Sequence, residues 1–280
     1  MRVIVRKLLR DVPAVLGLLL LLTVALVAVA GSWLAPYPED AFGANILQRL
    51  EAPSRNFPFG TDHLGRDVLS RVILGARSAL LVALTVVAGA MAIGVPLGLV
   101  AGYYRGWGAE LIMRITDVFL AVPQLVLALA LAQLLGAGLW SAMVALTLTY
   151  WPFFTRTVYA ETRRLKGALF VEALQGLGAS SGRILFGHIL PNAAGAILVR
   201  ASIGMGFTIL TAAVLGFLGV GAAPPSPDWG LAIAESRQYL PEAWWFATFP
   251  GLAIFAVVLG FNLLGDRLRD LIDPRLRRSR

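Results

Sequence analysis

The sequence predicts an all-helical membrane protein that crosses the bilayer several times, and both its composition and the spacing of its apolar stretches favour this fold class. Of its 280 residues, 58% are hydrophobic and 14% are charged, whereas about a quarter of the residues in soluble domains are charged. The mean hydropathy is +0.76. A helix needs roughly 20 apolar residues to cross a bilayer core of about 30 Å. Six stretches meet this length: residues 12–35, 79–102, 116–136, 139–159, 197–218 and 244–264.

The first stretch has some features of a secretory signal. Basic residues precede it, and Ala28-Val29-Ala30 resembles a cleavage site. Its apolar run is longer than the 7–15 residues that are typical of a signal peptide. We therefore expect a retained membrane anchor.

The segment between the first two stretches changes character at residue 62. Residues 36–60 are rich in turn-forming residues, whereas residues 62–77 place apolar side chains at helical spacing, with arginines on the other faces. Thr61 or Asp62 is the expected N-cap. The pattern predicts an amphipathic helix that lies at the membrane interface before the second stretch.

Three glycines share one face of the second stretch, because Gly94, Gly98 and Gly102 are spaced by four residues. Such a face lets another helix approach closely in lipid. We expect it to pack against a helix of the same chain. A contact between two copies of the chain is the alternative.

The polar residues inside the predicted spans are uncharged, which argues against a proton relay or a sodium site built from carboxylates. They are Gln124, Gln133, Thr147, Thr149, Thr155, Thr208, Thr211 and Asn262. Hydrogen bonds between helices are one interpretation. A hydrated translocation path is the other, with Gln133, Thr147, Thr208 and Thr211 as its candidates. Asp117 and Arg200 lie near the ends of the third and fifth stretches.

The distribution of Lys and Arg predicts the orientation of the spans. If the amino terminus is cytoplasmic, six spans return the carboxyl terminus to the same side. The inner segments then hold eighteen of the 24 cations and the outer segments six. The positive-inside rule favours this topology, with both termini cytoplasmic.

Several kinds of active site are excluded by composition. Cysteine is absent, and there are two histidines, so disulfides, thiolate catalysis and multi-histidine metal centres are ruled out. The two lysines, Lys7 and Lys166, do not stand in a phosphate-binding loop. The cations are spread between apolar blocks, which does not fit a nucleic-acid surface. We predict no catalytic residue, no metal site and no cofactor on this chain.

The inner connection between the fourth and fifth stretches, residues 160–196, is both basic and amphipathic. Apolar side chains between Leu165 and Leu177 fall on one helical face, and Gly178 interrupts the pattern. A second short helix is expected over residues 180–189, and Pro191 is expected to bend the chain. Physical reasoning leaves two interpretations open: a projecting foot, or a connector that lies along the membrane surface.

This connection resembles the EAA loop of bacterial ABC import permeases. The similarity lies in Glu172-Ala173-Leu174-x3-Gly178-x11-Leu190-Pro191, with Leu174 in place of the usual alanine. Further matches are similar to permeases of the dipeptide, oligopeptide and nickel family, in the C-type subunit. They are residues 59–71, 75–78, 101–104, 113–117 and 261–275. The chain is identified as a member of this family, in the cytoplasmic (inner) membrane of a bacterium.

The resemblance implies four partners and a mechanism. A second, homologous permease chain would form a heterodimer with this one, and two cytoplasmic ATPases would carry ATP and Mg. An extracytoplasmic binding protein would deliver the solute. The EAA loop would form a coupling helix that docks on an ATPase. The residues implied in coupling are Glu172, Ala173, Leu174, Leu177, Gly178, Leu190 and Pro191.

The outer segments 36–77 and 222–243 are then expected to face the binding protein. The contact residues that we single out are Arg66, Asp67, Asp228 and Trp229. We divide the chain into an amino-terminal anchor with its outer segment (1–77), a permease core (78–265) and a basic cytoplasmic tail (266–280).

Two other classes of protein compete with the permease interpretation. A secondary transporter or channel driven by an ion gradient would need no ATPase, but it predicts an intramembrane carboxylate or a repeated half-chain, which the sequence lacks. A membrane enzyme would need a metal or nucleophile constellation. The substrate is left open among peptides, nickel chelates, glutathione and some sugars, which relatives in the family handle.

Overall fold

The structure is a computed structural model that describes residues 11–272, so the basic residues at both ends of the chain lie outside the described part. The described residues form helices and one isolated bridge, between Thr61 and Asp67, and contain no strand. The long helices are α2 (Val12–Leu34), α3 (Val68–Tyr103), α4 (Trp107–Ala121), α5 (Gln124–Leu135), α6 (Leu139–Lys166), α9 (Leu190–Phe217) and α11 (Trp244–Ile272). The short ones are η1 (Ile46–Gln48), α7 (Leu169–Gly176), α8 (Ser181–Ile184), η2 (Leu185–Ile189), α10 (Trp229–Ser236) and η3 (Arg237–Tyr239).

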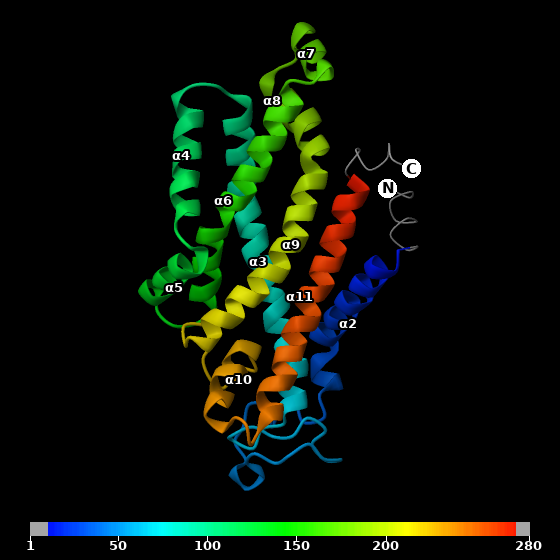
Figure 1. Cartoon of the computed structure of the whole chain (residues 1–280), viewed down its shortest axis with the longest axis vertical. Helices are drawn as coiled ribbons and strands as arrows, with labels where there is room; N and C mark the ends of the chain where they lie inside the picture. The colour runs from blue at the N-terminus through cyan, green and yellow to red at the C-terminus, as the bar shows by residue number, and fades with distance from the viewer. Residues whose placement is uncertain (1–10, 273–280) are drawn as a thin grey trace.

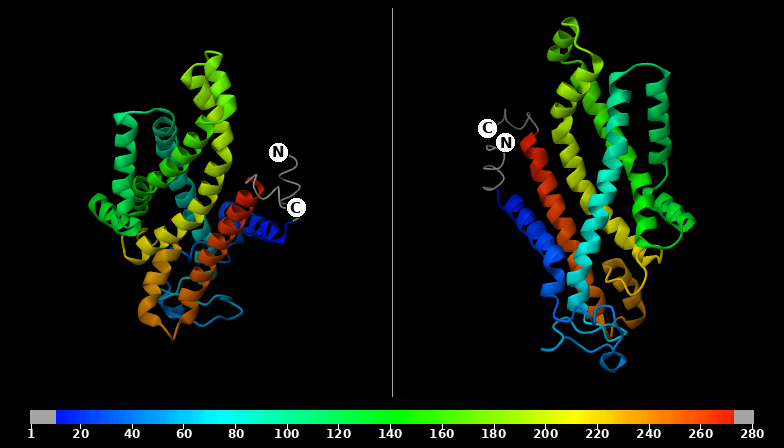
Figure 2. Two further views of the ribbon diagram at one scale, coloured as in Figure 1. Left: turned by 45° about the horizontal axis from the view of Figure 1, so that its top comes forward. Right: turned by 180° about the vertical axis from the view of Figure 1, so that it is seen from behind.

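The helices form an elongated bundle with α7 at one end, while α10 and the connection between α2 and α3 lie at the other (Figure 1). The start of α2 and the end of α11 lie on the α7 side of the bundle, where Arg267 pairs with Asp11 at 3.1 Å. Helix α3 packs along α6, and α11 lies between α2 and α9 (Figure 2). The all-helical fold is therefore confirmed for the described residues.

Length and composition identify four helices that can cross a membrane. They are α2, α3, the continuous helix Ser181–Phe217 and α11, and the bent pair of α4 and α5 makes a fifth candidate. Helix α6 is not among them, because threonines and aromatic residues such as Thr149 and Tyr150 dilute its apolar half and basic residues fill the other half. The structure thus supports four or five of the six predicted spans.

The third predicted span is not one straight helix. Helices α4 and α5 meet at Val122 and Pro123 with a bend of 91°. Proline lacks a backbone N–H and disfavours a helical residue before it, so α4 ends at Ala121 and α5 starts in a new direction.

The predicted amphipathic helix before the second span is wrong as a separate element. Helix α3 runs unbroken from Val68, and its N-cap is Asp67, whose carboxylate accepts the Ser70 N–H at 2.7 Å. Asp62 instead closes a turn by accepting the N–H groups of Leu64 and Arg66. Gly65 has a φ of +78°, which no helix continues through.

The predicted chain bend at Pro191 is also wrong. The helix continues through Leu190 into α9, and the widened turn η2 stands directly before it. There the Leu190 N–H bonds to the Leu185 carbonyl, five residues back. This wider turn accommodates Pro191, whose ring would clash with a normal helical turn.

The glycine face of α3 packs against α6 of the same chain, as predicted. A Cβ at Gly94 would lie 2.5 Å from the Trp151 carbonyl oxygen, and one at Gly98 would lie 2.7 Å from that of Thr155. At Gly102 the obstacle is the Thr162 side chain, at 2.6 Å. The glycines therefore bring the two helix backbones into direct contact. Both α3 and α11 also run across the proposed segment boundaries at residues 77 and 265.

Candidate functional site

The end of the bundle that carries α7 forms a projecting foot, residues 167–191, which we call the α7 foot (Figure 1). Its inner side is packed: Val171, Ile184 and Ile189 are fully buried, and Leu174 packs against the main core. Lys166 lies over the ring of Tyr103 at 5.0 Å, and Gln175 reaches the hydroxyl of that tyrosine. The α7 foot is therefore anchored to the end of α3 and to α6.

The outer side of the α7 foot exposes large apolar side chains. Leu169 is 82% exposed, Leu177 is 84% exposed and Phe186 is 64% exposed. Three large apolar side chains exposed on one short projecting segment favour an interaction site there. Glu172 and Ala173 lie on the same exposed helix, α7.

Gly178 fixes how the α7 foot ends. Gly178 has a φ of +75°. The Gly178 N–H donates to the Gln175 carbonyl, and the Ala179 N–H donates to the Leu174 carbonyl. This pair of bonds is a Schellman motif, which favours glycine because a side chain strains the left-handed backbone. No atom lies within 4 Å of where a Cβ at Gly178 would be. Leu190 and Pro191 stand at the first turn of α9, where the α7 foot returns to the bundle.

The opposite end of the bundle holds a buried cluster of charges, which we call the α10 junction: Asp62, Arg66, Arg71, Asp228 and Glu235. Arg66 pairs with Asp62 and, at 2.9 Å, with Glu235. Arg71 lies 3.6 Å from Asp62 and donates to the carbonyl oxygens of Ala41 and Ser226. Both arginines are nearly inaccessible, at 1% and 3% exposure. The α10 junction thus locks the connection between α2 and α3 onto α10.

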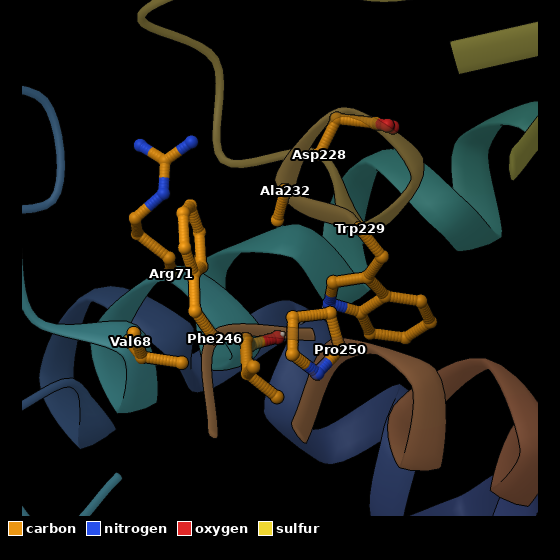
Figure 3. A pocket seen from close by; sticks show the side chains of 8 residues that line it. Val68, Arg71, Asp228, Trp229, Ala232, Phe246 and Pro250 are labelled. Atoms are coloured by element: carbon orange, nitrogen blue, oxygen red, sulfur yellow. Dashed lines mark hydrogen bonds between the residues drawn. The ribbon is translucent and has the colours of Figure 1, made fainter. Parts of the chain in front are cut away.

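Apolar and aromatic side chains surround the α10 junction where α3, α10 and α11 converge (Figure 3). The Trp229 indole donates to the Val72 carbonyl at 3.0 Å, and the Trp245 indole donates to that of Thr61 at 3.1 Å. Asp228 caps α10 by accepting the Leu231 N–H at 3.0 Å.

The predicted outer contact residues lie in or beside this buried region. Arg66, Asp67 and Trp229 are buried, and Asp228 is half-buried. Their side chains therefore offer a partner little surface in this conformation. The exposed surface around them includes a cavity of about 280 Å³ lined by Leu50, Tyr239, Glu242 and Trp245.

Burial also changes the protonation of groups at this end of the molecule. It raises the pKa of Asp228 and of Asp67, although the hydrogen bonds that each carboxylate accepts oppose the shift. Burial lowers the pKa of His63, against the attraction of Glu235 and Asp62. Asp62, His63 and Glu235 bring potential metal ligands within 4.8 Å of one another. Because Arg66 and Arg71 already neutralise both carboxylates, a cation there would have to displace a guanidinium group.

The four candidate path residues are not brought together by hydrogen bonds. Gln133 is exposed near the end of α5, while Thr208 and Thr211 are buried on α9. The Thr147 and Thr211 hydroxyls donate to carbonyls of their own helices, at 2.8 and 2.7 Å. These bonds lie within single helices, so they are not the hydrogen bonds between helices that one of the two interpretations expects.

Comparison with known proteins assigns the chain to a family. The model of the binding-protein-dependent transport system inner membrane component matches residues 94–278. That of the N-terminal transmembrane domain of oligopeptide transport permease C matches residues 1–53. The chain belongs to the inner-membrane permease family of ABC importers.

Relatives of this permease align over most of its length. The dipeptide transport system permease protein of Alkalihalophilus pseudofirmus is 42% identical over 97% of this chain and 89% of its own. The glutathione transport system permease protein of Pectobacterium atrosepticum is also 42% identical, over 97% of this chain and 90% of its own. The resemblance inferred from sequence motifs and the localisation in the inner membrane are thereby confirmed.

A solved structure shares the fold. The permease resembles a chain of the MetNI methionine ABC transporter in an inward-facing conformation, with a TM-score of 0.60 and 21% identity. The match covers 72% of this chain and 96% of that one.

Sequence reasoning missed two features of the permease. The charge cluster of the α10 junction joins residues far apart in the chain, since Arg66 and Glu235 are separated by 169 positions. The high density of charged residues between positions 62 and 71 was the sequence signal that could have indicated this cluster. The second feature is the ion pair between Asp117 of α4 and Arg156 of α6, which ties the bent pair to the bundle.

Proposed function

We propose that this permease is the transmembrane subunit of an ATP-driven importer for a peptide-like solute such as a dipeptide or glutathione. It forms the path together with a homologous permease chain and takes its energy from two cytoplasmic ATPases that bind ATP and Mg. The substrates named for the two 42% identical relatives support this solute class. An extracytoplasmic binding protein delivers the solute.

The observation that carries the proposal is the α7 foot. Its exposed apolar tip, with Leu177 at 84% exposure, suits docking into a groove on an ATPase, while its packed inner side joins three long helices. Glu172, Ala173, Leu174, Leu177 and Gly178 form the docking helix and its end, and Leu190 and Pro191 connect it to α9. A movement of the foot therefore moves α3, α6 and α9 with it.

The energy that must pass through this contact sets a requirement on its stiffness. Inverting a 1:99 population of inward-open and outward-open states needs about 5.5 kcal/mol of differential stabilisation. A loosely tethered polar loop would dissipate this energy. The buried Val171, Ile184 and Ile189 make the α7 foot part of the core instead.

We further propose six membrane crossings with both termini cytoplasmic: α2, α3, the α4–α5 pair, α6, Ser181–Phe217 and α11. The proximity of Asp11 and Arg267 on the α7 side supports this, since an even number of crossings returns the chain to the side where it began. The outer surface formed by residues 36–77 and 222–243 then faces the binding protein. Gln133, Thr147, Thr208 and Thr211 remain candidates for the path.

The experiment is a coupling assay in proteoliposomes that contain the complete importer. Gly178→Asp and Glu172→Lys are expected to abolish solute uptake while ATP hydrolysis continues and the permease stays in the membrane. Gly176→Ala is the matched control, because a Cβ at Gly176 also meets no atom within 4 Å but its backbone has an ordinary φ. Normal uptake by either foot variant would contradict the coupling role.

An ion-gradient-driven transporter is the alternative function. It predicts uptake by the permease without any ATPase subunit, driven by a proton or sodium gradient. The same proteoliposomes, prepared without the ATPases, separate the two functions.

A further inference from the structure

Arg200 is a charged residue within the candidate span Ser181–Phe217, and its guanidinium group lies over aromatic rings. Its guanidinium carbon lies 4.7 Å from the ring centre of Phe153 and 5.4 Å from that of Tyr150, both on α6. Its Nε atom is buried and has no hydrogen-bond partner. The cation is therefore held by aromatic faces, and at least this N–H is left unsatisfied.

The surroundings of Arg200 hold its aromatic partners in place. Tyr150 is buried and fits against Gly204, where a Cβ would lie 2.7 Å from the tyrosine hydroxyl. Phe207, two turns along α9 from Arg200, stacks on Tyr150 with ring centres 6.1 Å apart. Phe207 is 44% exposed, so this cluster opens onto a free face of the described chain.

No carboxylate among residues 11–270 lies within ion-pair distance of Arg200. The nearby pair of Arg156 and Asp117 shows the usual solution, in which a cation on a long helix finds an acid on its neighbour. Arg200 lies near the end of the fifth apolar stretch, where a charged side chain that finds neither a partner nor water is still costly and marks a candidate functional site. A guanidinium group stacked on rings still presents its N–H edge, which matches a carboxylate in two parallel hydrogen bonds.

We propose that Arg200, held by Tyr150 and Phe153, binds the carboxylate of the solute as it passes through the path. This inference rests on the proposed function, because a peptide-like solute carries a free carboxylate. It identifies a part of the solute that the permease itself recognises, in addition to recognition by the binding protein. A lipid phosphate and a carboxylate of the second permease chain are the competing sources of the anion.

A thiol at the exposed edge of the cluster tests the anion site without knowledge of the solute. The chain has no cysteine, so Phe207→Cys introduces its only thiol and leaves Tyr150 and Phe153 in place, in a complex whose other subunits are made cysteine-free. We expect an anionic water-soluble methanethiosulfonate to react faster than its cationic analogue. Adding Arg200→Gln should lower this anion-to-cation rate ratio by about tenfold. An unchanged ratio would overturn the proposal.

The same thiol distinguishes the sources of the anion. Solute delivered by the binding protein should slow the reaction of Phe207→Cys. If the thiol reacts only with a membrane-soluble maleimide, as expected for the control Leu16→Cys on the exposed face of α2, Arg200 faces lipid and the proposal fails. If the thiol reacts with neither the methanethiosulfonates nor the maleimide until the second permease chain is removed, that chain covers Arg200 and the proposal also fails.

Uptake by the complete importer gives the second test. Arg200→Gln should lower the rate of solute uptake by roughly tenfold to a hundredfold, because it loses hydrogen bonds to a charged group, and Arg200→Lys should retain part of the rate. ATP hydrolysis without solute should not change. Arg105→Gln, which removes an exposed cation from a loop, is the control.

The outcomes separate this inference from the proposed function. If the wild-type importer shows no ATP-dependent uptake, both are wrong. If the wild type is active and Arg200→Gln takes up solute normally, the inference alone is wrong. If the ligand on the binding protein proves to have no carboxylate, the inference and the proposed peptide-like solute are both wrong.

Discussion

Arg66 and Arg71 show how single residues hold the end of the bundle opposite α7. Each is almost completely buried, and together they balance Asp62 and Glu235. Leaving a buried charge without its partner costs far more than losing an exposed ion pair. The sequence showed the charges of residues 62–71 but not their partner, since Glu235 comes from a helix that follows the last turn-rich segment. Their burial depends on tertiary packing, and periodicity could not predict it.

Removing Arg66 should destabilise the permease strongly. Arg66→Ala leaves Asp62 buried without its closest cation, and we expect a loss of about 3–5 kcal/mol in the free energy of unfolding. The matched control is Arg114→Ala, which breaks an exposed pair with Glu110 and should cost about 1 kcal/mol or less. Thermal unfolding of the two purified variants in detergent measures the difference, and equal losses would refute the structural role of the α10 junction.

The buried carboxylate of Asp228 gives a prediction about pH. Burial raises its pKa above the ordinary value of 3.8, so the folded chain holds this proton more tightly than the unfolded chain. The stability that this group contributes is therefore fully present below pH 3.8 and declines as the pH rises through the raised pKa. Asp228→Asn keeps a capping oxygen and removes this decline. Its melting temperature relative to the wild type should rise with pH across that interval.

A control separates charge from capping at Asp228. Asp228→Ala loses the bond to the Leu231 N–H and should cost about 1 kcal/mol at every pH. If the difference between Asp228→Asn and the wild type does not vary with pH, burial does not govern this carboxyl group.

Among the elements, the contact between α3 and α6 was the most predictable from sequence and the bend between α4 and α5 the least. Glycines repeated every four residues predict a close helix contact because the spacing itself creates the flat face. Pro123 was visible as well, but a proline inside an apolar stretch is compatible with a kinked span or with two helices. The choice depends on what packs around it, here α6.

The glycine face gives a prediction at this scale. Gly98→Ala places a methyl group 2.7 Å from the Thr155 carbonyl oxygen and the Val158 Cβ, so α3 and α6 must separate. We expect a loss of about 1–3 kcal/mol. Gly108→Ala on α4 meets no atom within 4 Å and should stabilise its helix by about 0.5–1 kcal/mol. A lower melting temperature for Gly98→Ala and a higher one for Gly108→Ala would support the contact between α3 and α6. An unchanged melting temperature for Gly98→Ala would refute it.

The two ends of the molecule are built differently, and the sequence predicted the helices of the α7 foot but not the charge cluster of the α10 junction. The α7 foot was recognisable because its chemistry is local: an amphipathic helix, then a glycine with a left-handed backbone, within twelve residues. The α10 junction was not, because it joins three segments of the chain. The six-span topology lies between these cases. The apolar stretches of the sequence predict all six spans, but α6, whose buried side carries threonines and aromatic rings, is not among the helices that length and composition identify as membrane-spanning.

The central claim is that the exposed tip of the α7 foot lies on the cytoplasmic side and seats on an ATPase. Leu177→Cys provides the only thiol of the chain at this tip, so its reactivity in sealed vesicles of known orientation measures the claim directly. We predict labelling by an impermeant maleimide from the cytoplasmic side in the permease without its ATPases, and weaker labelling once the importer is assembled. In the assembled importer the same thiol should form a cross-link to a cysteine in the ATPase groove. Labelling from the outer side alone would contradict the account.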